Sequence, residues 1–446
     1  MSATAATKDN PAKQVLVQLA AIAAAFALGF VLVALFGFDP FEVFGVLWNG
    51  SVGNIENLGW SLQNTTPLIF TGLSVSLAFR AGLFNIGAEG QLVAGAFAAG
   101  VVGWAVPALA ATPGLAKLGF WTEHWYPTGA KALMLVFVAG VMRLLWITFE
   151  AGAAERADSG VSVKSHWKRS TVGFAVLLGL YFVVPGASGW LFGIGNAFVL
   201  PLAILSAAVA GALWAFIPAY LRAHFGVSEV INTIMFNFLA ALLASWLLTT
   251  PTFKAPGAIP QTEAVGASAQ LSQLGRWVPM ASVAVPLSKS QLNTGFVFAL
   301  VCALAVGWLL WRTALGYELR ALGSNRDAAA ANGIPVPRTI LTAMMLSGAL
   351  AGLGGAEQVL GVHHHFVKDF WIGLGFTGIA VALVGKSHPI GVVAAAFLFG
   401  ALQNGAVEID MMTLFPRELI LVLQALIIFL VSSGPVVADL ITRRRK

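Results

Sequence analysis

Charged side chains are scarce in this sequence: they make up 10% of its 446 residues, whereas hydrophobic residues make up 58%. A soluble domain carries about 25% charged residues, which cover its water-facing surface. This chain cannot cover such a surface, so the composition excludes a cytosolic enzyme, a secreted disulfide-linked scaffold and a disordered protein. Together with a mean hydropathy of +0.84, it predicts a protein of the lipid bilayer.

Cysteine is almost absent as well. Cys302 is the only one, so no disulfide can form within the chain.

Lys and Arg outnumber Asp and Glu by 25 to 19, but they are scattered among apolar runs rather than gathered in one patch. Scattered basic residues are typical of the orientation charges of a membrane protein and do not indicate a nucleic-acid-binding surface.

Apolar runs long enough to cross a bilayer recur along the whole chain. A spanning helix needs about 20 mostly apolar residues, because its backbone polar groups must be satisfied within the segment. We therefore predict an all-α polytopic integral membrane protein with about 12 spanning helices, or about 10 if two short runs are re-entrant. The predicted spans are 15–38, 65–79, 90–111, 132–149, 172–192, 198–221, 230–249, 294–311, 339–361, 371–385, 390–407 and 418–438.

The basic residues orient these spans. If the N-terminus lies inside, most Lys and Arg residues fall on the inner side, among them Arg80, Arg222, Arg320 and the basic end of the chain. The positive-inside rule then places both termini in the cytoplasm. The predicted organisation is a cytoplasmic tail (1–14), a transmembrane domain (15–438) and a basic cytoplasmic tail (439–446), with an external loop at 251–291 and a cytoplasmic segment at 313–338. The external loop is either a cap or landing surface or an unstructured connection.

The cytoplasmic segment 313–338 encodes a short helix outside the membrane. Ser324 and Asp327 have the spacing of a capping box ahead of a run of four alanines. Asn332 and Gly333 then supply a stop, and the prolines that follow forbid continuation. Small alanines would let another surface approach closely. The segment is either a helix that docks a cytoplasmic partner or an ordinary interfacial helix.

Two further polar groups lie close to membrane depth. In the first, Asn85, Glu89 and Gln91 stand among glycines between two apolar runs, and they either face a cavity or form a cytoplasmic turn in which Glu89 balances Arg80. The second is a stripe on the run 230–249. Residues four apart share one helix face, and the stripe is formed by Glu229, Thr233 and Asn237, with Asn232 beside it. Such a stripe faces either partner helices or a pathway.

Three local patterns are rejected as sites. Gly385-Lys386-Ser387 lacks the upstream glycine and the strand-to-helix context of a phosphate-binding loop. Consecutive histidines at 363–365 lack a chelating geometry and supporting ligands. No Ser/His/Asp or HExxH arrangement occurs. We therefore predict a protein that is not an enzyme and holds no metal.

Three motifs stand in order along the chain: RAGLFNIGAEGQLVAGA at 80–96, GVSEVINTIMFN at 226–237 and LRALGSNRDAAAANGI at 319–334. In these motifs, and over roughly 63–430, the sequence resembles permease subunits of ABC importers, in particular the nucleoside and simple-sugar branch related to ribose and branched-chain amino acid permeases. The resemblance implies a subunit of the bacterial plasma (inner) membrane that translocates nucleosides or simple sugars.

The resemblance also implies partners and residue roles. The partners would be a second homologous permease, an external substrate-binding lipoprotein and a cytoplasmic ABC ATPase that binds ATP and Mg, with no cofactor in this chain itself. The residues that would couple to the ATPase are Ala321, Gly323, Asn325, Ala328, Ala329, Gly333 and Ile334. The residues assigned to the translocation pathway or substrate are Asn85, Glu89, Gln91, Glu229, Asn232 and Asn237.

The sequence departs from the family in the region 113–196, which is longer than expected and holds an extra helical hairpin at 132–192. Two alternatives to the ATP-driven importer remain at this stage. An ion-gradient-driven secondary transporter of a small polar solute would show internal repeats and intramembrane carboxylates, and both are weak here. An intramembrane enzyme would need an acidic or histidine constellation at an interface, which the sequence lacks.

Overall fold

The structure is a computed structural model that describes residues 11–111, 188–278, 280–413, 415–416 and 418–443. By contact density the chain divides into two compact units, residues 1–103 with 202–446 and residues 104–201. In the second unit the description covers only the end of one helix and the beginning of another. The predicted extra hairpin 132–192 therefore lies almost entirely outside the described residues.

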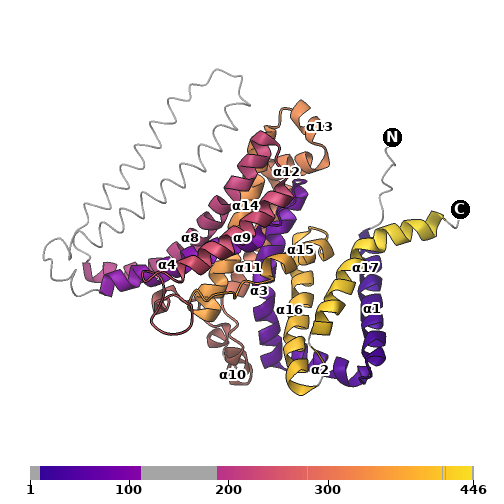
Figure 1. The fold of residues 1–446 in the computed structure, drawn as a ribbon, viewed down its shortest axis with the longest axis horizontal. Helices are drawn as coiled ribbons and strands as arrows, with labels where there is room; N and C mark the ends of the chain where they lie inside the picture. The colour runs from indigo at the N-terminus through magenta and orange to yellow at the C-terminus, as the bar shows by residue number, and fades with distance from the viewer. Residues whose placement is uncertain (1–10, 112–187, 279, 414, 417, 444–446) are drawn as a thin grey trace. The chain divides into compact units, whose positions relative to one another are not determined.

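Helices dominate the described part of the chain, in which the only β-structure is a pair of isolated bridges, Gln261 with Val367 and Gln273 with Asn293. In chain order (Figure 1), the helices are α1 (Pro11–Leu35), α2 (Pro40–Val52), α3 (Ile55–Arg80), α4 (Ala88–Ala111), α8 (Ser188–Phe225), α9 (Glu229–Leu247), α10 (Ala281–Lys289), α11 (Gly295–Arg312), α12 (Ala314–Ser324), α13 (Arg326–Ala331), α14 (Val336–Glu357), the π-helical segment Gln358–His363, α15 (Leu374–Val384), α16 (Pro389–Met412) and α17 (Glu418–Arg443).

Six helical segments within the described residues are long and apolar enough to cross a membrane. They are Val17–Leu35, Val199–Phe225, Glu229–Leu247, Gly295–Arg312, Val336–His363 and Pro389–Met412. Shorter apolar helices occur at Leu374–Val384 and Glu418–Val431. The chain is thus a multi-pass membrane protein, as its composition predicts, while the count of about 12 spans stays a prediction.

Helix α2 was not predicted, nor were α10 and α12. Helix α2 has 13 residues, too few to cross a bilayer, and it begins with a strong local signal. The Asp39 carboxylate accepts a hydrogen bond from the Phe41 N–H at 2.8 Å, and Pro40 occupies the first helical position. A search for long apolar runs overlooks such a helix, although the Asp39 cap and Pro40 indicate a helix start in the sequence.

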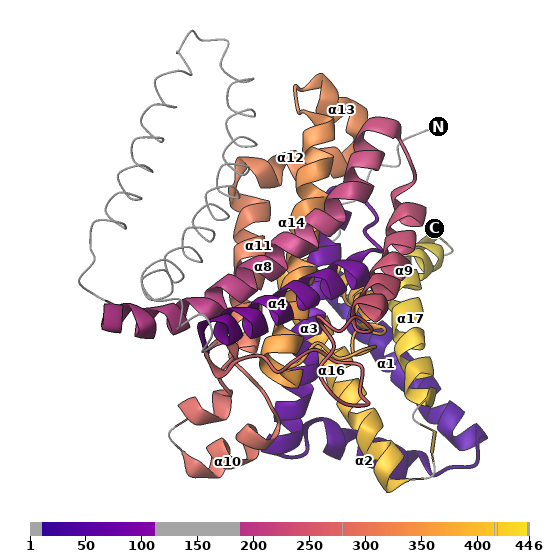
Figure 2. The same ribbon diagram turned by 60° about the vertical axis from the view of Figure 1, so that its left-hand side comes forward.

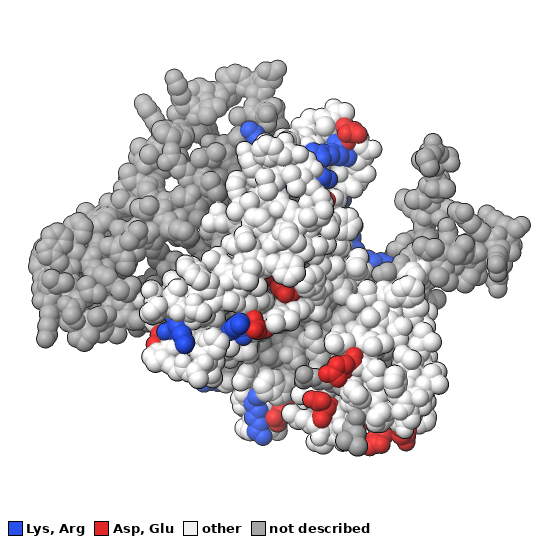
Figure 3. All heavy atoms as spheres, viewed as in Figure 1, with Lys and Arg blue, Asp and Glu red and all other residues white. Residues whose placement is uncertain are grey.

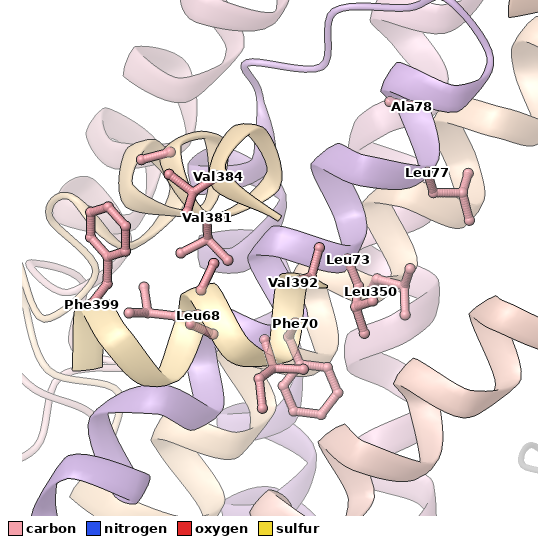
Figure 4. Packing of buried hydrophobic residues seen from close by; sticks show 14 of the residues in the cluster. Leu68, Phe70, Leu73, Leu77, Ala78, Leu350, Val381, Val384, Val392 and Phe399 are labelled. Atoms are coloured by element: carbon pink, nitrogen blue, oxygen red, sulfur yellow. The ribbon is translucent and has the colours of Figure 1, made fainter. Parts of the chain in front are cut away.

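The core of the first unit is built around α3. Almost every residue of α3 between Thr65 and Ala78 is buried, because the helix packs against α2, α11, α14, α15 and α16. In Figure 4, Leu68, Phe70 and Leu73 of α3 lie among Val381 and Val384 of α15, Val392 and Phe399 of α16, and Leu350 of α14. Because other helices rather than lipid cover α3, the helix can carry buried polar residues such as Thr71, Ser74 and Ser76.

Helix α14 crosses α4 and α8 through glycines. A β-carbon added at Gly352 would lie 3.2 Å from the Gly211 Cα of α8 and would collide with the Ala207 carbonyl oxygen. A β-carbon at Gly95 of α4 would likewise collide with the backbone of Gly352. Small residues at these crossings let the three backbones touch, which is how helices associate without a hydrophobic driving force between them.

The segment 251–291 is not an unstructured connection, while its external position and its role as a cap or landing surface stay predictions. Residues 262–271 form backbone hydrogen bonds with 360–366: the N–H groups of Thr262, Val265 and Leu271 donate to the carbonyls of Phe366, His364 and Leu360 at 2.8–3.0 Å. Thr262 is fully buried there.

Helices α2 and α10 lie at one end of the first unit and α12 and α13 at the other in both views (Figures 1 and 2).

Candidate coupling and translocation site

The segment 313–338, named here the docking segment, folds as two helices rather than one. Helix α12 ends at Ser324, and Asn325 begins α13 by accepting hydrogen bonds from the N–H groups of Asp327 and Ala328 at 2.9 and 3.0 Å. The prediction of Ser324 as the cap is therefore wrong. Ser324 instead donates back to the Arg320 carbonyl, a competing bond that serine hydroxyls make at the end of a helix. The predicted stop holds, since Gly333 has φ +78 directly after α13.

The predicted coupling residues divide by exposure. Gly323, Asn325, Ala328 and Gly333 are exposed, and Ala321 is half-buried. In contrast, Ala329 and Ile334 are only 3% and 9% exposed, and the Ile334 N–H donates to the Ala329 carbonyl. The exposed surface of α13 therefore comprises Arg326, Asp327, Ala328, Ala330 and Ala331, while Ala329 is buried against the rest of the protein. Figure 3 shows basic and acidic side chains at the end of the first unit that holds α12 and α13, where Arg326 and Asp327 are exposed.

Asn85 and Gln91 form the centre of the bend between α3 and α4. Each donates to the other, Asn85 Nδ2 to Gln91 Oε1 at 2.9 Å and Gln91 Nε2 to Asn85 Oδ1 at 3.0 Å, and both are at most 1% exposed. Asn85 Oδ1 also accepts from the Gly87 N–H at 3.0 Å. The Asn85 side chain thereby satisfies one backbone N–H of the bend, as a buried backbone donor requires.

Helix α14 joins this bend through a buried serine pair. Asn85 Nδ2 donates to the Ser347 hydroxyl at 2.7 Å, and Ser347 donates to the Ser74 carbonyl of α3 at 2.7 Å. The two hydroxyls lie 3.0 Å apart. The bend is therefore hydrogen-bonded to α14 directly, and Ser347 connects it to α3. Neither serine stood out in the sequence, because a single Ser in an apolar helix is common.

Helix α9 reaches the bend with Asn237. Its Oδ1 accepts from the Gly90 N–H and its Nδ2 donates to the Ile86 carbonyl, both at 2.8 Å. The predicted stripe is real, since Glu229, Thr233 and Asn237 are all at most 8% exposed. Its members differ in surroundings, however. Glu229 forms an ion pair with Arg222 at 2.9 Å across the turn from α8, and Asn232 is half-buried beside the stripe.

Glu89 contacts α15 rather than Arg80. The Gly373 N–H donates to Glu89 Oε2 at 3.2 Å, and Gly375 packs directly on the Glu89 backbone. This N–H group lies at the N-terminal end of α15, where no intrahelical acceptor exists and a negative charge is stabilising. The alternative in which Glu89 balances Arg80 within a simple turn is therefore wrong.

Arg80 binds the opposite end of α15. Its Nε donates to the Ser387 carbonyl at 2.9 Å and its Nη2 to the Lys386 carbonyl at 3.2 Å, in the turn that follows α15. The guanidinium also stacks over Trp311 of α11, 5.5 Å from the ring centroid. Nearby, burial and the charge of Arg80 both lower the pKa of His388, with burial the larger cause.

A second buried cluster surrounds Glu357 and Gln358, a polar pair that the sequence marks only weakly. Glu357, at the junction of α14 with the π-helical segment, is 2% exposed. Its Oε1 accepts from Gln63 Nε2 at 3.0 Å and Asn293 Nδ2 at 2.9 Å, and its Oε2 accepts from Gln358 Nε2 at 2.7 Å. The signal was present, since a carboxylate and an amide are adjacent in an apolar run. Their partners, Gln63 and Asn293, are far away in sequence, so only the fold brings them together.

Among the described residues, no group of three or more His, Cys, Asp or Glu side chains is arranged to hold a metal ion. His364 has a left-handed backbone with φ +55, and His365 Nδ1 lies 3.0 Å from the Thr262 carbonyl. The consecutive histidines thus belong to the ordered contact between 260–271 and 360–368.

One protein-family model matches most of this chain. The family described as "Branched-chain amino acid transport system / permease component" covers residues 58–432. The chain belongs to this family. It is a multi-pass ABC-transporter permease subunit, as the three motifs of the sequence predicted.

Curated relatives match along almost their whole length. A guanosine ABC transporter permease, NupP of Bacillus subtilis, is 31% identical over 94% of this chain and 93% of its own. A nucleoside ABC transporter permease, NupB of Lactococcus lactis, is 29% identical over 95% and 92%. A glucose ABC transporter permease, TsgB13 of Haloferax volcanii, is 30% identical over 92% and 86%. No solved structure shows a significant match.

Proposed function

We propose that this permease imports nucleosides or related simple sugars across the bacterial inner membrane, with both termini in the cytoplasm. The observation that carries the proposal is the near-complete match to permeases named for guanosine and nucleosides. The match to a glucose permease of similar identity keeps a sugar within the same proposal, since a nucleoside contains a pentose.

The proposed partners are a second homologous permease, a cytoplasmic ABC ATPase that binds ATP and Mg, and an external substrate-binding lipoprotein. The docking segment supports the ATPase contact, because α13 presents Ala328, Ala330 and Ala331 on a short capped helix at one end of the bundle. In this proposal Gly323, Asn325 and Gly333 line the contact, whereas Ala329 and Ile334 support it from beneath. ATP-driven closure of the ATPase pair would move this segment.

The bend between α3 and α4 has a supporting role in the proposal. In this conformation Asn85 and Gln91 bond each other, and Asn237 of α9 bonds the backbone of Gly90 and Ile86 in the bend. We infer that they hold the discontinuous start of α4 at membrane depth. Discontinuous helices at that depth are where transporters form their solute pathway. Glu89, Glu229 and Asn232 belong to the same proposed region, Glu89 through α15 and the other two at the start of α9.

Uptake measurements in cells that lack this chain test which solute it transports. Labelled guanosine, uridine, glucose and leucine would be supplied to wild-type cells, to deletion cells and to deletion cells that express the chain again. We expect nucleoside uptake to fall in the deletion and to return on re-expression, with leucine uptake unchanged. If only glucose uptake changes, the solute is a simple sugar; if only leucine uptake changes, the proposed solute is wrong.

A second measurement tests the energy source. The chain would be crosslinked in membranes, purified through a tag, and the proteins that accompany it in comparable amounts identified. We expect an ABC ATPase and a second permease. Uptake that survives ATP depletion but stops when an uncoupler collapses the ion gradient would instead indicate a secondary transporter.

A further inference from the structure

Helix α15 is held at its two ends by the two ends of one short stretch of chain, the segment 80–89. Arg80 binds the carbonyl oxygens of Lys386 and Ser387 directly after α15, and Glu89 accepts from the N–H of Gly373 directly before it. A cation at the C-terminal end and a carboxylate at the N-terminal end both complement the helix dipole. With 11 residues, α15 is about 16 Å long, so segment 80–89 runs the length of the helix and is attached at each end.

The docking segment touches segment 80–89 backbone to backbone. Gly323, near the end of α12, packs on Arg80 and Gly82: a β-carbon added at Gly82 would lie 3.0 Å from the Gly323 Cα, and one added at Gly323 would collide with the Arg80 carbonyl oxygen. Gly82 has φ +68, a conformation that glycine adopts without strain. Because no side chain separates the two backbones, a displacement of α12 cannot be absorbed by rotamer changes at this contact.

Helix α15 is also fixed sideways, on the central helix α3. A β-carbon at Gly378 would come within 2.5 Å of the Thr71 Cβ, and one at Gly72 within 2.7 Å of the Val381 Cγ1. At the start of α15, a β-carbon at Gly375 would lie 2.5 Å from the Glu89 Cα. Close-packed contacts of this kind transmit displacement as a body, since packed interiors deform little.

We propose that segment 80–89 and α15 form one rigid unit, the relay, through which the docking segment moves the helix bundle. Arg80 and Glu89 are the positioning residues that keep the relay rigid. The proposal rests on the proposed function in one respect, because it takes the docking segment as the part that binds the ATPase. It adds which part of the bundle receives the movement and which two side chains secure it.

The first test uses the assembled transporter in liposomes, with its ATPase, second permease and binding lipoprotein. Arg80→Ala, Glu89→Gln and the double variant are compared with Arg312→Ala, which removes an exposed arginine from the end of α11. The measured quantities are bound ATPase, ATP hydrolysis and solute imported per ATP hydrolysed. A structural role alone would lower all three together.

We expect each single variant to keep bound ATPase and hydrolysis within about twofold, while import per ATP falls about tenfold, the size of a typical coupling between sites. The double variant should be no worse than the more severe single variant, because both residues secure the same unit. Arg312→Ala should match the wild type. Unchanged import per ATP in both single variants would overturn the relay.

A second measurement does not depend on how these variants fold. In a Cys302→Ser background, Phe84→Cys and Ile372→Cys carry spin labels at side chains that are 54% and 69% exposed, one in segment 80–89 and one next to the start of α15. The distance between the labels is measured in the assembled transporter with and without trapped ATP. We expect it to stay constant within about 2 Å, whereas a shift of about 5 Å, the size of one helical turn, would overturn the relay.

The outcomes separate the two proposals. If the chain assembles with no ATPase, the proposed function is wrong. A complex that hydrolyses ATP and imports solute, but in which the label distance changes, counts against the relay alone.

Discussion

Asn85 and Gln91 exchange two hydrogen bonds, at 2.9 and 3.0 Å, across the bend where α3 gives way to α4. Both donors and both acceptors of the pair are thereby used inside a region from which water is excluded. Asn85 Oδ1 also accepts from the Gly87 N–H, a backbone donor of the bend that would otherwise be buried without a partner, at a cost of about 1–3 kcal/mol. The pair also ties the bend to Ser347 of α14, so the bend and the neighbouring helices are held as one arrangement.

Asn85→Ala and Gln91→Ala should each destabilise the protein by about 1–3 kcal/mol, because each leaves a buried amide partner unsatisfied. The double variant should cost less than the sum of the two, since the second substitution removes the group that the first left unpaired. Midpoints of thermal unfolding in detergent, compared across the four proteins of the cycle, measure this. Strict additivity would show that the two amides act independently.

Ala328→Trp and Ala329→Trp should fail for different reasons. Ala328 is exposed on α13, so its replacement should leave insertion and thermal stability near wild type and reduce the amount of bound ATPase about tenfold or more. Ala329 is 3% exposed, so a large side chain there should overpack α13 and cost about 1–3 kcal/mol or more of stability. Pull-down of the ATPase and thermal unfolding separate the two effects. Normal ATPase binding by Ala328→Trp would remove α13 from the contact.

Gly352→Ala and Gly307→Ala make the same change in two surroundings. At Gly352 the new methyl group would collide with the Ala207 carbonyl of α8, whereas at Gly307 the nearest atom is the Pro389 Cγ, 3.8 Å away. We expect Gly352→Ala to destabilise the protein by about 1–3 kcal/mol. Gly307→Ala should be neutral or stabilising by up to about 1 kcal/mol, because alanine favours a helix over glycine. The two midpoints of thermal unfolding are compared directly, and equal values would contradict the backbone contact at Gly352.

Glu357→Leu should be among the most damaging single substitutions in the first unit. It removes the acceptor of Gln63, Asn293 and Gln358 at once. The amide donors of Gln63 and Gln358 lose this partner, at about 1–3 kcal/mol each, while Asn293 Nδ2 keeps only its bond of 3.3 Å to Gln63 Oε1. The amount of protein in the membrane and its thermal midpoint report the loss. Gln63→Leu is the milder comparison, because Asn293 and Gln358 still satisfy the carboxylate. If Glu357→Leu proves as stable as Gln63→Leu, the cluster contributes little to folding.

The amino-acid sequence alone determined that the chain spans a membrane, because 10% charged residues cannot cover a water-facing surface. It also placed most described helices within a few residues, since a long apolar run leaves the backbone no alternative to a helix in lipid. The stripe of Glu229, Thr233 and Asn237 followed from helical spacing, and the stop at Asn332 and Gly333 from local cap chemistry. These features depend on neighbours within one or two turns.

The tertiary structure decided which polar groups meet. Arg80 and Glu89, nine positions apart, bind opposite ends of α15 some 300 residues away in the chain rather than each other. Glu357 of α14 meets Gln63 through the packing of α3 against α14, and it meets Asn293 from the segment just before α11. Whether Ala328 or Ala329 faces outward depended on how α13 rests on the bundle. Periodicity along the chain indicates which residues share a face, but the partner that covers this face is set by packing between segments distant in sequence.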